Sequence, residues 1–163
     1  MIMKLVLTLL LWVSFAGTPD LASIRKMYSD VAKSESNAKD FVAKLSGVSS
    51  NDDKILVAYK AASILVDSKF EKKLGQKMER FKEGAKLLEA TIKSDPSNIE
   101  MRMIRLSVQE DVPSITGYKK NIKEDKKFIT TYYAAQGAAL KDYLKDFVLQ
   151  SKSFSEKEKQ FVK

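Results

Sequence analysis

The sequence predicts an all-α protein built of stacked antiparallel helical hairpins. Apolar residues recur every three or four positions along most of residues 18–163, which is the period of one helix face. Short clusters of Gly, Pro, Ser, Asn and Asp separate these stretches, as expected where one helix ends and the next begins. No stretch shows the alternation that is typical of a β-strand. We therefore expect about six to seven helices.

Residues 1–16 are predicted to be a cleavable secretory signal peptide. Lys4 supplies a positive charge, Leu5–Phe15 is mostly apolar, and Ser14-Phe15-Ala16 offers small residues at the spacing that a signal peptidase needs. About 12 apolar residues span only about 18 Å as a helix, which is short of the roughly 30 Å of a hydrocarbon core. We expect cleavage after Ala16. Residues 17–163 would then be a single helical domain that is not integral to a membrane and is periplasmic or secreted.

Two helices are predicted before residue 48. The first has Thr18 as its N-cap and Pro19 in its first turn, where the missing N–H costs nothing. The second ends at Gly47, a residue that favours helix C-termini. Their apolar faces consist of Leu21, Ile24, Tyr28 and Val31, and of Ala38, Phe41, Val42 and Leu45.

The middle of the chain predicts three helices. The helix over 54–66 is apolar on nearly all sides and should be central, and its alanines allow close approach of its neighbours. After a charged connection over 67–75, a helix over 77–93 carries one apolar stripe. Asp95-Pro96 should end it, and Asn98 should cap the next helix. That helix, over 99–110, is apolar on two faces and should be buried between neighbours.

The C-terminal part begins with a predicted loop over 112–117, around Pro113. Helices are then expected over 118–133 and 140–149, with Gly137 between them. Ser155 and Glu158 match a capping box for a short final helix that ends at Val162.

Composition excludes several kinds of chemistry. The chain has no Cys and no His, so disulfides, Cys–His and Ser–His–Asp catalysis and His- or thiolate-based metal sites are absent. No phosphate-cradling glycine loop and no EF-hand spacing occurs. We expect no cofactor and no metal. General acid–base catalysis would have to use carboxylates, Lys or Tyr.

The formal net charge is +8, and it falls by one if cleavage removes Lys4. Such a charge attracts anionic surfaces, including envelope polymers, lipid headgroups and nucleic acid. Two lysine-rich clusters, over 69–86 and 119–127, are interleaved with acidic residues, which favours a solvated, ion-paired face over nucleic-acid binding. The basic residues are mainly lysines, whereas selected phosphate sites often recruit arginine forks.

The strongest candidate site lies around the helix with two apolar faces. Arg102 and Arg105 are three residues apart on it, where little solvated surface remains for two guanidinium groups. One interpretation is structural ion pairing with Glu100, Asp111, Glu124 or Asp125. The other is a site for an anion or a peptide carboxylate, formed by Arg102 and Arg105 together with Tyr118 and Asn121.

Two resemblances accompany this pattern. Residues 83–88, with Ile92, Asp95, Pro96 and Asn98, resemble the second half of a tetratricopeptide repeat, which implies TPR-like packing of helical hairpins; no period of about 34 residues recurs. Residues 59–62, 98–102, 117–118 and 121–126 resemble a group of small exported helical proteins found in Bacteroidota. That resemblance implies a helical fold and export, and it implies no particular activity.

These observations favour an exported helical-hairpin module that acts through protein–protein contacts or by binding an anionic ligand. The alternative from another class is a carboxylate-dependent hydrolase of the cell envelope. A third hypothesis is adhesion of a basic domain to anionic envelope polymers. A closed cleft with two carboxylates within reach of each other would favour the enzyme, and an open groove lined by Arg, Tyr and Asn would favour binding.

Overall fold

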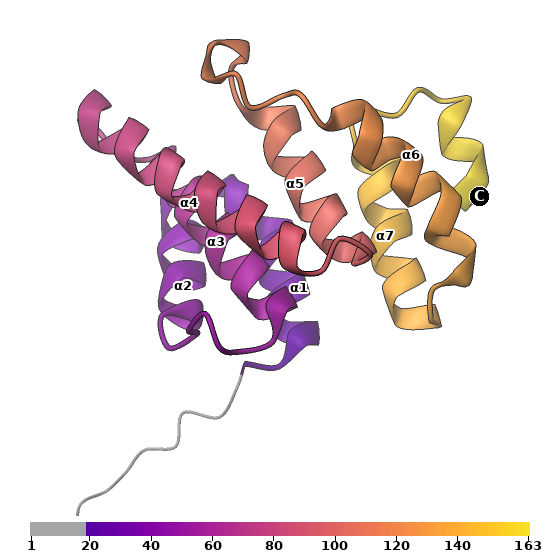
Figure 1. The fold of residues 1–163 in the computed structure, drawn as a ribbon, viewed down its shortest axis with the longest axis horizontal. Coiled ribbons are helices and arrows are strands. Elements are labelled where there is room, and N and C mark those ends of the chain that lie inside the picture. Colours follow the sequence, from indigo (N-terminus) through magenta and orange to yellow (C-terminus); the bar gives the residue numbers. More distant parts are fainter. Residues whose placement is uncertain (1–18) are drawn as a thin grey trace, which may run out of the picture.

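Helices account for most of residues 19–163, the part of the chain that this computed structural model describes (Figure 1). Within those residues there is no strand, and seven α-helices are present, so the predicted all-α class and helix number are confirmed. The predicted signal peptide, residues 1–16, lies outside the described residues. The α-helices are α1 (Leu21–Asp30), α2 (Glu35–Leu45), α3 (Lys54–Ser68), α4 (Leu74–Ser94), α5 (Ile99–Asp111), α6 (Ile122–Tyr132) and α7 (Ala138–Gln150). Four short 3-10 helices accompany them: η1 (Val31–Lys33), η2 (Ser114–Thr116), η3 (Tyr133–Ala135) and η4 (Glu158–Val162).

Helix α3 is the centre of the N-terminal part, as its sequence predicts. Ala58, Tyr59, Ala61 and Ala62 are fully buried, because α1, α2, α4 and α5 all pack against this helix. Its small side chains leave room for these neighbours.

Helices α3 and α4 form a closely packed antiparallel hairpin. Arg80 of α4 pairs with Asp67 near the end of α3 at 2.8 Å, and Gly84, further along α4, lies against Ala61 and Leu65. A Cβ atom on Gly84 would lie 2.7 Å from Cγ of Leu65 and 3.0 Å from the carbonyl oxygen of Ala61. The helices can approach this closely because Gly84 has no side chain.

Helix α5 lies between the two halves of the described chain. In Figure 1 it separates α1–α4 from α6 and α7, and it contacts α3, α4, α6 and α7. Met101, Met103, Ile104 and Leu106 are at most 1% exposed. The prediction that both apolar faces of this helix are buried is therefore confirmed.

Several predicted helix ends are wrong by a few residues. Asp20, not Thr18, caps α1, since its carboxylate accepts a hydrogen bond from the backbone N–H of Ser23 at 2.9 Å. Helix α3 continues to Ser68 and α4 begins at Leu74, so the connection between them is shorter than 67–75. Other caps are confirmed: Asn98 accepts from the N–H of Met101.

Helix α6 begins at Ile122, four residues later than predicted, because a turn occupies residues 118–121. Gly117 ends η2 with a φ of 67°, a left-handed conformation that favours glycine. The ring of Tyr118 then packs edge-on against Phe81 of α4 at 5.7 Å, which anchors the turn. In the final segment Ser155 and Glu158 exchange the hydrogen bonds of the predicted capping box.

The helices described are not long and apolar enough to cross a bilayer. TPR-like packing of successive hairpins stays a prediction.

Candidate functional site: an apolar groove beside a buried charge cluster

The four residues singled out from the sequence lie together around carboxylates. Asp125 of α6 is completely buried. It accepts hydrogen bonds from Nε and Nη2 of Arg105, at 2.7 and 2.6 Å, and from Nη1 of Arg102 at 3.2 Å. One buried carboxylate therefore joins both arginines of α5 to α6.

Two further carboxylates complete the cluster. Glu124 accepts from Nη1 of Arg102 at 2.6 Å and from the side-chain amide of Asn121 at 3.0 Å. Glu89 of α4 accepts from Nη1 of Arg105 at 2.9 Å and from the hydroxyl of Tyr118 at 2.8 Å. All four candidate residues thus bind acidic side chains of this same chain.

The remaining donors of Arg102 point at the backbone. Its Nε and Nη2 donate to the carbonyl oxygen of Pro96, at 3.3 and 3.1 Å, and its guanidinium group lies 5.0 Å from the ring centre of Phe128. An added anion would face three carboxylates with only two guanidinium groups to attract it. The geometry favours the ion-pair interpretation of Arg102 and Arg105 over the anion site.

Of the four carboxylates considered as partners from the sequence, Glu124 and Asp125 serve the two arginines. Glu100 instead forms a bidentate pair with Arg25, and Asp111 pairs with Lys152. Glu89, on α4, is a further partner of Arg105 that was not predicted. Glu89 lies between Leu88 and Ala90, and nothing in the sequence around it indicates this role.

Burial and pairing act in opposite directions on the titration of this cluster. Burial lowers the pKa of Arg105, but the hydrogen bonds and charges of Asp125 and Glu89 outweigh this effect and hold the pKa above its ordinary value. Burial raises the pKa of the Asp125 carboxyl, and the hydrogen bonds and charges of Arg105 and Arg102 oppose that rise. Because the guanidinium stays charged and bidentate, the cluster works as a buried structural ion pair.

A separate groove of about 660 Å³ opens beside α5, and none of the four candidate residues lines it. Met103, Ser107 and Val108 of α5 line its base. The walls come from α1, the hairpin of α3 and α4, the η2 loop and α7. Its volume falls in the range typical of ligand-binding sites.

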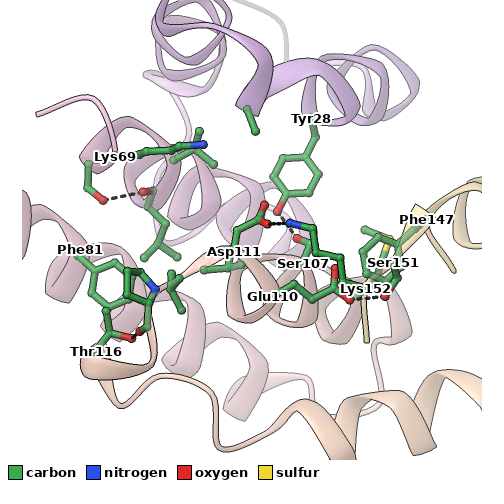
Figure 2. A pocket seen from close by; sticks show the side chains of 18 of the residues that line it. Tyr28, Lys69, Phe81, Ser107, Glu110, Asp111, Thr116, Phe147, Ser151 and Lys152 are labelled. Atoms are coloured by element: carbon green, nitrogen blue, oxygen red, sulfur yellow. Dashed lines mark hydrogen bonds and ion pairs between the residues drawn. The ribbon is translucent and has the colours of Figure 1, made fainter. Parts of the chain in front are cut away.

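Aromatic side chains contribute much of the lining. Figure 2 shows Tyr28 reaching from α1 toward Ser107, with a distance of 2.5 Å between the two hydroxyl oxygens. Burial raises the pKa of Tyr28, so its hydroxyl stays neutral at physiological pH. Phe81 of α4 and Phe147 of α7 lie on opposite sides of the view in Figure 2.

Large apolar side chains remain exposed around the groove. Leu74 is 73% exposed, Met78 37% and Ile115 95%, and all three are among the residues that line it. The sequence did carry a signal for two of them. Leu74 is apolar in a charged connection, and Ile115 lies in a loop between Pro113 and Gly117.

The charges of the groove differ between its two ends. Lys69 and Lys77, from the α3–α4 hairpin, form no ion pair with any residue among 19–163. At the α7 end the lining includes Asp146, and Asp111 there pairs with Lys152 at 2.8 Å, as Figure 2 shows. Glu110 accepts hydrogen bonds from Ser151 and from the backbone N–H of Ser153. One end is therefore basic and the other carries an excess of carboxylates.

No cluster of three or more acidic side chains that could hold a metal ion is present in residues 19–163. Comparisons of the chain with protein-family models, with curated proteins and with solved structures found no match.

Proposed function

We propose that this chain is an exported helical module whose function is to bind a segment of a partner protein in the groove beside α5. One observation carries the proposal: Leu74 and Ile115, both largely exposed, stand at the same apolar groove. Exposed apolar surface that is gathered around one hollow is typical of an interaction site.

The exposed rim favours a protein segment over a small ligand. A small molecule would fill the base of the groove and leave Ile115 in water. An amphipathic helix laid along the groove would cover both the base and the rim, which is how many grooves recognise helical partners.

The charges specify the partner further. Acidic residues at one end of its helix would meet Lys69 and Lys77, and a basic residue at the other end would meet Asp146. Such complementarity sets the direction in which the helix lies and speeds association. The partner we propose is therefore an amphipathic helix with an apolar stripe and oppositely charged ends.

Site-specific photo-cross-linking in the native host tests this proposal. A benzoylphenylalanine replaces Ile115 at the groove or, as the matched control, Leu149, an apolar residue of α7 that is 37% exposed and outside the lining. We expect a discrete protein adduct from position 115 only, and a cross-linked peptide with the predicted stripe and charges. The adduct should disappear when Leu74→Ser and Met78→Ser are added.

Three outcomes would contradict the proposal: equal adducts from both positions, adducts with lipid alone, or no adduct from position 115. Turnover of an envelope glycan or peptide by the purified protein, lost in Asp146→Asn, would instead establish the hydrolase alternative.

A further inference from the structure

The second basic cluster of the sequence forms a cationic face on α6 because the acidic residues of this helix pair with α5. Residues 123–127 contain three lysines and two acids, so the sequence alone indicates little local charge. In the structure Glu124 and Asp125 are engaged by the arginines of α5. Lys123 and Lys127 are exposed on the side of the helix opposite the buried Asp125. The ion pairs with α5 thus leave the outer face of α6 cationic.

A hollow of about 480 Å³ lies between this face and the C-terminal segment, away from the groove. Four lysines line it, Lys123, Lys126, Lys127 and Lys157, with Glu158 as the only acidic residue of the lining. Lys126 is already paired with Glu158 at 2.9 Å. The other three ammonium groups form no ion pair with any residue that the structure describes.

Several contacts hold in place the C-terminal segment that lines one side of the hollow. Glu158 accepts hydrogen bonds from the N–H and the hydroxyl of Ser155 and from Lys126, and Phe161 packs edge-on against Tyr133 at 5.4 Å. These contacts hold η4 against Lys126 of α6 and against η3. The backbone of Lys157 adjoins this anchored segment, and its side chain lines the same hollow as those of Lys123 and Lys127.

We propose that this hollow binds a linear polyanion made of phosphate units, through Lys123, Lys127 and Lys157. Lys123 and Lys127 are four residues apart, so their Cβ atoms lie about 5–6 Å from each other along α6. The ammonium groups of Lys123 and Lys127 on α6, together with that of Lys157 in the C-terminal segment, can contact successive anionic groups of one linear chain. Lysine binds phosphate as a point charge, whereas planar carboxylates are better matched by arginine, which the lining lacks.

A soluble chain fits the hollow better than a membrane surface. The lining contains one large apolar side chain, Phe161, and it is partly buried against Tyr133. The exposed aromatic residue of this region, Tyr132, is outside the lining. No apolar side chain of the lining is thus free to insert into a bilayer.

Inorganic polyphosphate is the probe for the experiment, and its affinity for the purified protein is measured by calorimetry at several salt concentrations. Three phosphate contacts predict a slope of about −2 for log affinity against log salt, which is a loss of about 16-fold between 50 and 200 mM. The triple variant Lys123→Gln, Lys127→Gln, Lys157→Gln should bind about tenfold more weakly at 50 mM and show a flatter slope. Lys126 is left in place because it holds Glu158.

The control variant carries Lys26→Gln, Lys44→Gln and Lys93→Gln, which removes the same charge from exposed lysines of α1, α2 and α4. It should bind the probe almost as the unchanged protein does, and circular dichroism should show both variants folded. Equal weakening in the two variants would overturn the proposal, since general charge would then explain the binding. Preferential binding of anionic phospholipid vesicles or of duplex DNA, dependent on the same three lysines, would also overturn it.

Discussion

Arg105 and Asp125 form a bidentate ion pair between α5 and α6, with both N–O distances below 2.8 Å and the carboxylate completely buried. Removal of the guanidinium would leave that carboxylate with Arg102 as its one charged partner. The pair therefore couples the stability of the C-terminal helices to the centre of the fold.

Replacement of Arg105 by Ala should lower the free energy of unfolding by about 3–5 kcal/mol, because it leaves a buried charge inadequately compensated. Denaturant titration measures this loss. Arg105→Lys should recover only part of it, since an ammonium group keeps the charge but not the fork. Lys152→Ala is the control, and it should change stability little because its pair with Asp111 is exposed. A nearly unchanged stability in Arg105→Ala would instead favour a ligand-binding role for this side chain.

The close contact of α3 and α4 at Gly84 predicts an unusual response to alanine. A Cβ atom there would clash with Leu65 and with the backbone at Ala61. Overpacking of this kind costs about 1–3 kcal/mol, against a gain of about 1 kcal/mol in helix propensity. We expect Gly84→Ala to destabilise the protein in thermal unfolding. Gly75→Ala, at the start of the same helix with no atom within 4 Å of the added Cβ, should stabilise it slightly; stabilisation by both changes would contradict the close packing.

The capping box of the final segment predicts a specific dependence on pH. A hydrogen bond from Lys126 has the largest effect on the pKa of Glu158. Together with hydrogen bonds from the N–H and the hydroxyl of Ser155, it lowers this pKa from 4.5 to about 2. Since the unfolded chain keeps the higher pKa, the ionised Glu158 stabilises the fold fully above about pH 4.5. This stabilisation is lost as the pH falls toward 2. The difference in unfolding free energy between the unchanged protein and Glu158→Gln should therefore shrink across that interval.

Glu83→Gln is the control for this pH experiment, because the Glu83 carboxylate forms no ion pair or hydrogen bond with residues 19–163. A midpoint near 4.5 for the Glu158 carboxyl carbon in an NMR titration would show that the prediction is wrong.

Export is tested by the mass of the protein from its native host. Lys4, the short apolar run and Ser14-Phe15-Ala16 predict a mature chain that begins at Gly17. Intact-mass spectrometry of the soluble envelope fraction should show that species. Full-length chain in the membrane fraction would contradict cleavage.

The features predicted correctly from the sequence depend on short stretches of chain. The burial of α3 and of both faces of α5 follows from apolar periodicity within each helix. The cap at Asn98 and the capping box of Ser155 and Glu158 involve residues three positions apart. Such patterns are complete within one element, so they can be recognised before it is known which helices pack together.

The features that were missed depend on pairing between distant elements. Glu89 meets Arg105 and Tyr118 only after α4, α5 and the turn before α6 have packed together. The groove likewise requires residues from α1 to α7, and its exposed rim depends on where Ile115 lies in three dimensions. The cationic face of α6 could not be predicted because it depends on the pairing of Glu124 and Asp125 with the arginines of α5.

The bonds that fix α1 have a consequence for the order of folding. Arg25 binds Glu100, 75 residues away, and the hydroxyl of Tyr28 meets Ser107, 79 residues away. Closing loops of this length carries an entropy cost, and only the contacts between α1 and α5 offset it. Those contacts cannot form until both helices are present. If the chain is exported as we propose, its first helix therefore cannot form these two hydrogen bonds until α5 has also crossed the membrane. A chain that crosses amino-terminus first would lack both hydrogen bonds until roughly two thirds of it had passed through.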